Sequence, residues 1–376
     1  MRMKKFKKLL LLFFTVNTTF AQVDNNVFFD TIANSNDSSK LYLSFSNLNF
    51  LKNNEYFHEI ATGYTLFGSQ LNPRIAWVPN PHVRLESGIF LRKDFGTADF
   101  KTLAPTFSLK LNKNGYSFIF GNLESSLNHQ LIEPLYNYER VITNRLENGI
   151  QFKATKKNIW LDSWMDWERQ QYIASPFKEV ITAGLSSRVT LFDNEVFKIK
   201  VPLQAIVYHH GGQIDTDTTP LLTLANTAAG LSMEADLSKN SWLIKNIRFD
   251  NYYAYYRDLS GTKQGLYIKG HGIYSNLLIK TKYHFNLMAS YWNGDYFVAA
   301  RGGYLVQSVS SDYLFAKYST EDNSQLFILR MMYQRELYPG LLLDVRFEPY
   351  KDINNNFVEF SYGVYISYKK DFALKK

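Results

Sequence analysis

The lengths of the connections between strand-like segments constrain the fold of this chain most strongly. About sixteen segments, each near the ~10 residues of a tilted membrane-crossing strand, show alternation of apolar and polar residues with a period of two. Connections after even-numbered segments are short, such as "PNPH" at 79–82 and "NKNG" at 112–115. Those after odd-numbered segments are nearly all longer and polar, such as 125–145 and 294–323. A soluble sandwich does not sort its loops in this way, so the pattern favours an all-β antiparallel barrel.

Several segments carry charge along one complete face. In "VRLESGIFLR" Val83 and Leu85 lie opposite Arg84 and Glu86, and "IWLDSWMDWE" repeats the pattern. A charge that faces lipid at mid-membrane depth costs ~2 to 4 kcal/mol, so we expect the charged faces to line a hydrated lumen. The expected lumen-lining residues are Arg84, Glu86, Arg92, Asp162, Asp166, Lys198, Lys200, Arg248, Asp250, Asp344 and Arg346. Ion pairs that only stiffen the wall are the alternative for each of them.

The amino terminus predicts an exported protein. Five basic residues precede an apolar run from Leu9 to Val16 and a small-residue ending at Ala21, which is typical of a signal peptide spanning residues 1–22. Removing these residues lowers the net charge from +8 to about +3, so the mature chain lacks the basic character expected of a nucleic-acid-binding protein. A polar and loosely ordered segment is expected at 23–39, followed by the barrel at 40–372.

Cysteine and aromatic usage agree with this class. The chain has no cysteine, which excludes disulfides and thiolate metal sites, and it has 26 Tyr, 29 Phe and 6 Trp. Aromatic residues lie next to almost every short turn, as in the girdles of membrane barrels. They are Trp77, Tyr116, Trp160, Phe192, Trp242, Tyr283 and Tyr338.

With these features and the aromatic last segment "FVEFSYGVYISYKKDF", the chain resembles bacterial outer-membrane β-barrels, and among them the sixteen-stranded general porins. Its composition is similar to that of Bacteroidota surface proteins. The resemblance implies a Gram-negative outer-membrane location, contact with membrane lipid and a homotrimer. It also implies passive or weakly selective diffusion of small hydrophilic solutes, with no cofactor and no nucleic acid as a partner.

The third long loop, Glu124 to Arg145, has an apolar centre that predicts folding against the inner wall rather than exposure to water. The porin resemblance implies that such a loop forms the constriction of the pore. Its charged residues are then the selectivity residues: Glu133, Glu139, Arg140 and Arg145. An outward cap that packs on neighbouring loops is the alternative.

The stretch "YHHGGQIDTDTTP" at 208–220 is the segment most similar to a catalytic or metal site. Adjacent histidines on an extended chain point in opposite directions, and His210 with Asp215 matches no strong metal motif, so no metal site is expected. No nucleophile and base are recognisable, and we predict that the chain is not an enzyme. The alternatives are an outer-membrane hydrolase of lipid or peptide, a closed barrel acting as an adhesin or assembly platform, and a transporter of hydrophobic ligands.

Overall fold

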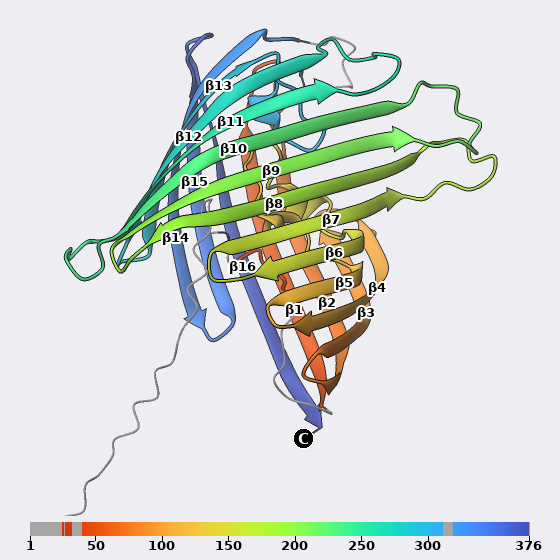
Figure 1. The fold of residues 1–376 in the computed structure, drawn as a ribbon, viewed down its shortest axis with the longest axis vertical. Helices are drawn as coiled ribbons and strands as arrows, with labels where there is room; N and C mark the ends of the chain where they lie inside the picture. The colour runs from red at the N-terminus through yellow and green to blue at the C-terminus, as the bar shows by residue number, and fades with distance from the viewer. Residues whose placement is uncertain (1–24, 26, 32–39, 311–318, 376) are drawn as a thin grey trace, which may run out of the picture.

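The computed structural model describes residues 25, 27–31, 40–310 and 319–375. In this part of the chain, sixteen antiparallel strands run in sequence order around one closed barrel, in which β16 pairs back with β1 (Figure 1). The strands are β1 (Lys40–Glu55), β2 (Thr65–Asn80), β3 (Val83–Asp94), β4 (Thr102–Lys113), β5 (Tyr116–Asn122), β6 (Asn148–Thr155), β7 (Ile159–Arg169), β8 (Glu179–Asp193), β9 (Phe197–Gly211), β10 (Leu222–Asp236), β11 (Ile244–Asp258), β12 (Lys269–Thr281), β13 (Phe285–Asp295), β14 (Asn323–Tyr338), β15 (Leu341–Asp352) and β16 (Phe357–Lys375). The predicted all-β barrel is confirmed.

Loop lengths follow the predicted alternation. Only two residues connect β2 to β3 and β4 to β5, whereas long loops gather at the opposite end, which we call the outer end. Three outer loops position the features described below. They are L1 (residues 56–64), L3 (residues 123–147) and L7 (residues 296–322). Within the described residues, no helix has the length and hydropathy that crossing a membrane requires.

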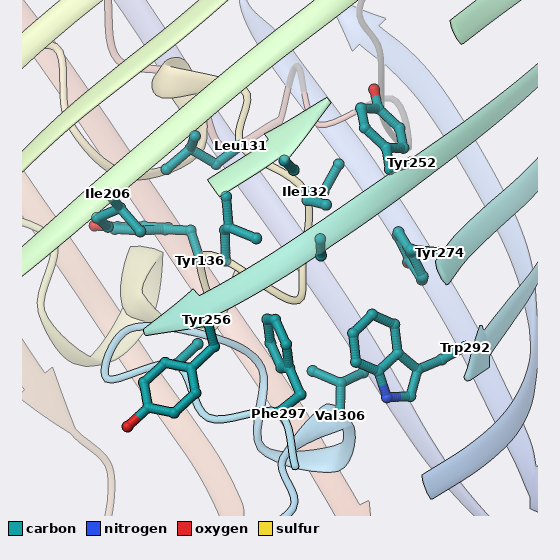
Figure 2. Packing of buried hydrophobic residues seen from close by; sticks show 14 of the residues in the cluster. Leu131, Ile132, Tyr136, Ile206, Tyr252, Tyr256, Tyr274, Trp292, Phe297 and Val306 are labelled. Atoms are coloured by element: carbon teal, nitrogen blue, oxygen red, sulfur yellow. The ribbon is translucent and has the colours of Figure 1, made fainter. Parts of the chain in front are cut away.

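The lumen contains the main apolar core. L3 and residues 296–310 of L7 fold inward. L3 carries a short 3-10 helix η1 (Ser126–His129) and a single α-helical turn α1 (Arg140–Thr143), while L7 carries η2 (Tyr304–Val306). Leu131 and Ile132 of L3 belong to one buried apolar cluster with Phe297 of L7 and with Tyr252 and Trp292 of the wall (Figure 2). The apolar centre of L3 therefore lies inside the barrel, because its side chains are removed from contact with water in that position.

Part of the polar amino-terminal segment also enters the lumen. Phe28 packs edge-on against Tyr365 of β16 with ring centroids 4.8 Å apart, and its carbonyl oxygen accepts a hydrogen bond of 2.9 Å from Arg145 of L3. Asp30 pairs with Arg74 at 3.1 Å. The expectation that this segment is loose is wrong for these residues, because one aromatic side chain and one carboxylate supply anchors that average polarity does not reveal. The predicted signal peptide lies outside the described residues.

Candidate functional site

L3 is held from several sides of the barrel. The Ile132 N–H donates to Oε1 of Gln204 on β9 at 2.8 Å, and Gln70 on β2 donates to the Ile142 carbonyl at 2.9 Å. Arg92 on β3 donates to the same carbonyl at 2.9 Å. These contacts secure L3 across the lumen.

The four predicted selectivity residues have separate partners in this arrangement. Glu133 pairs with Arg330 of β14, and Glu139 pairs with Lys52 of β1 at 3.1 Å. Arg140 donates to the Tyr136 hydroxyl at 3.1 Å and lies 3.6 Å from Glu168. Arg145 is the residue that donates to the Phe28 carbonyl. Glu133 and Glu139 line one small cavity together with Lys52 and Arg330, whereas Arg140 and Arg145 have other partners. The role of all four residues in selectivity stays a prediction.

The predicted wall residues form short-range ion pairs. Arg84 lies 2.7 Å from Glu86, and Arg346 lies 2.6 Å from Asp344, in each case two residues away on the same strand face. Nine of the predicted lumen residues are buried with inward-facing positions, namely Arg84, Glu86, Arg92, Asp162, Asp166, Arg248, Asp250, Asp344 and Arg346. Asp250 pairs with Arg248 at 2.8 Å. Lys198 and Lys200 are half-buried and pair with Asp193 and Glu234.

His129 on η1 is the most enclosed histidine of the lumen. Its Nδ1 lies 3.0 Å from Asp162 and its Nε2 lies 2.7 Å from Glu147, and the ring stacks on Trp164 at 3.6 Å between centroids. With both nitrogens donating to carboxylates, the ring is positively charged and has no lone pair to accept a proton. His129 therefore cross-links L3 to the wall and cannot serve as a base.

The spaces left between L3 and the wall are small. One cavity beside Arg330 and Glu348 and another beside Arg74 and Arg145 measure about 30 Å³ each. A buried water needs at least ~10 to 15 Å³ measured in this way, so each cavity has room for a few water molecules. Both cavities are far smaller than another cavity at the outer end.

A larger cavity of about 350 Å³ lies at the outer end, between L1, L7 and the ends of β14, β15 and β16. Its lining includes His58, Ser319, Glu321, Tyr350 and Phe357. Burial raises the pKa of Glu321, and the nearby Asp352 carboxylate raises it further. This cavity has the size and mixed polarity of a ligand site.

His58 of L1 enters this cavity as half of a histidine–carboxylate pair. Its Nδ1 lies 2.6 Å from Oε1 of Glu359 on β16, and its ring stacks on Phe357. Glu359 also accepts hydrogen bonds from the Phe57 backbone N–H at 2.8 Å and from the Tyr350 hydroxyl. Three donors therefore hold a carboxylate that is 4 % exposed, whereas the imidazole remains 47 % exposed. Within the described residues, Nε2 of His58 has no hydrogen-bond partner.

The 208–220 stretch forms the outer end of β9 and the loop after it. Nε2 of His210 lies 3.0 Å from the Arg169 guanidinium, and Asp215 pairs with Lys178 at 3.0 Å. The hydrogen bond from Lys178 lowers the pKa of Asp215. Positive neighbours at both residues disfavour a cation there, and no group of three or more potential ligands is placed to hold a metal in the part of the chain that the structure describes.

The sequence matches the family described as Lipid A 3'-O-deacylase-type over residues 33–376. The chain belongs to this family. The prediction that the chain is not an enzyme is therefore wrong, because the family is named for a hydrolase of acyl esters. The sequence matches no curated protein.

Solved structures with the same fold include outer-membrane proteins. OprD of Pseudomonas aeruginosa is 9% identical with a TM-score of 0.52, over 92% of this chain and 98% of that one. OccAB4 of Acinetobacter baumannii is 11% identical with a TM-score of 0.50, over 90% and 100%. A loop L8 deletion mutant of OmpT of Vibrio cholerae is 11% identical with a TM-score of 0.52, over 89% and 100%. These similarities confirm the porin-like barrel, and passive diffusion through it stays a prediction.

His58 and Glu359, which are 301 residues apart, were not predicted as site residues from the sequence. Neither residue lies in a recognisable motif, and only the pairing of β1 with β16 brings them together. The available signal was weak: a histidine followed by an acid shortly after the first strand, and Glu359, which is one of two inward-facing acids in the last strand, with Asp371.

Proposed function

We propose that this protein is an outer-membrane hydrolase that removes an acyl chain from an ester of lipid A or a closely related lipid. Membership of the deacylase-type family supports the reaction class. The observation that carries the assignment to a site is the His58–Glu359 pair, whose histidine lines the cavity of about 350 Å³. The likeness of the barrel to Gram-negative outer-membrane proteins supports the location.

The pair can act as a general base with its orienting carboxylate. Glu359 accepts the Nδ1 proton of His58, so the neutral ring carries its lone pair on Nε2. Nε2 can then take a proton from a water molecule that attacks the ester carbonyl, and the positive ring that results is stabilised by Glu359. The proton returns to the departing alkoxide oxygen, which leaves a fatty acid and an alcohol as products.

Water is a better candidate for the nucleophile than the serine in the cavity lining. Ser319 donates its hydroxyl hydrogen to Glu59, so it is already engaged by another carboxylate. No contact between Ser319 and His58 accompanies this bond in the described residues. The reaction then proceeds without an acyl-enzyme intermediate.

The proposal is tested with purified full-length protein in mixed micelles that contain lipid A. We expect mass spectrometry to detect loss of an acyl chain, and we expect His58→Ala to reduce the rate at least 100-fold. His271→Ala is the matched control, because His271 also pairs with a carboxylate, Asp295 at 3.4 Å, on the outer part of the barrel but does not line the cavity. Full activity of His58→Ala, or equal loss in both variants, would contradict the assignment.

A further inference from the structure

The outward face of β1 differs from what lipid contact requires. Alternate residues of β1 from Ser44 to Asn54 are buried in the lumen, so the residues between them face the membrane. Of these outward residues, Asn47, Asn49 and Asn53 carry amides. An outward face in a membrane barrel is normally apolar, and the β4 positions Leu103, Pro105, Phe107, Leu109 and Leu111 follow that rule.

Two of these amides lie within the apolar band. Leu41 of β1 pairs with Trp77, which is exposed beside a short turn and marks the inner membrane boundary. Asn47 and Asn49 are six and eight residues further along a strand tilted by ~45°, so they lie roughly 14 to 19 Å from that boundary. The apolar band of such barrels is about 25 Å tall.

The hydrogen-bond donors and acceptors of these amide side chains are only partly paired within the chain. Asn47 donates to the Gln70 carbonyl at 2.8 Å and to the Ser69 hydroxyl at 3.2 Å, and Asn49 donates to Oδ1 of Asn47 at 2.6 Å. An amide side chain has two N–H donors and an oxygen acceptor. The second N–H and the Oδ1 of Asn49 have no partner among the residues that the structure describes, although they face the membrane.

We propose that the outward face of β1 is the contact surface with a second copy of this chain, related by a two-fold axis along the membrane normal. Acyl chains cannot hydrogen-bond with an amide, whereas the same amide of a second copy supplies both a donor and an acceptor. A two-fold contact places one surface against itself, so the free groups of Asn49 meet those of its counterpart. The proposed hydrolase site does not enter this inference.

The chain is suited to a cysteine test because it has no cysteine of its own. Single variants Phe45→Cys, Asn47→Cys, Asn49→Cys and Leu51→Cys are expressed at full length and oxidised in isolated outer membranes. We expect a disulfide-linked dimer that is strongest for Asn49→Cys, because the bond requires Cα atoms within ~7 Å. Asn251→Cys is the matched control, since Asn251 is an outward-facing amide on β11, six strands away around the barrel.

Native mass spectrometry of the unmodified protein and of the Asn47→Leu/Asn49→Leu variant gives the second readout. We expect a dimer for the first and loss of the dimer for the second, with heat-modifiable migration on gels retained because leucine fits a lipid-facing position. An unmodified protein that is monomeric, a dimer that survives the double substitution, or cross-linking no stronger on β1 than at the control would overturn the proposal. A cross-link to a different protein would replace the second copy with another partner and would also overturn it.

Discussion

Replacing Glu359 with Gln tests how the candidate base is held. The substitution keeps the shape of the side chain and removes the charge that faces Nδ1 of His58 at 2.6 Å. With about 4 Å between charge centres and an effective dielectric of ~20, the attraction on the protonated ring is about 4 kcal/mol. Because the imidazole is 47 % exposed, solvent screening leaves about half of this, ~2 kcal/mol. A barrier raised by this amount lowers kcat roughly 30-fold.

The assay is steady-state release of fatty acid from lipid A by the Glu359→Gln variant. We expect KM to change little, because the cavity keeps its volume and the substitution acts mainly on the transition state. Asp295→Asn removes the carboxylate partner of His271 and serves as the control with unchanged kcat. If kcat of Glu359→Gln equals that of the unmodified protein while His58→Ala is inactive, the orienting role of Glu359 is refuted.

Three further predictions concern the loops. Deleting residues 128–143 removes most of L3 from the lumen, and we expect single-channel conductance in planar bilayers to rise while the barrel stays folded; an unchanged conductance would place the obstruction elsewhere. Leu135→Ala removes a side chain that is 0% exposed, and we expect a loss of about 2 to 4 kcal/mol in stability, measured as a lower unfolding midpoint. The Lys178 hydrogen bond lowers the pKa of Asp215 below 3.8. The ionised Asp215 carboxylate therefore stabilises the loop fully above pH 3.8, and this stabilisation is lost as the pH falls through the lowered pKa. The protection of residues 212–221 against hydrogen exchange, taken relative to the intrinsic exchange rate at each pH, should therefore fall at low pH, and Lys178→Met should abolish this step.

The strand order was predictable because the signal is local. The predicted number of about sixteen segments agrees with the sixteen strands of the structure, since alternation and turn residues act within about ten positions. The inward folding of L3 was predictable for the same reason, because its apolar centre is a continuous stretch. Its individual partners depend on strands up to 210 residues away, as with Tyr138 and Glu348, and no local pattern encodes them.

The face that β1 turns to the lumen was harder to predict. Its inward residues include Ser46 and Lys52, and its outward residues include Asn47 and Asn49, so hydropathy does not distinguish the two faces. Closure against β2 and β16 decides the direction, and this depends on the register of all strands together. The candidate site was missed for a related reason, because it is divided between the two ends of the barrel sequence.

The pairing of β1 with β16 has a consequence for the time at which activity appears. Barrel closure joins the first strand to the last, and sequence-distant contacts of this kind require the whole chain. Before that step, His58 and Glu359 belong to separate ends of an open sheet, and the imidazole has no carboxylate to fix its tautomer. Under the proposed function, a chain in transit is therefore a latent enzyme. Its hydrolytic activity then begins only when the finished barrel is in the membrane that holds its substrate. The lipid esters of other membranes are not hydrolysed during transit, although no separate inhibitor acts on the chain.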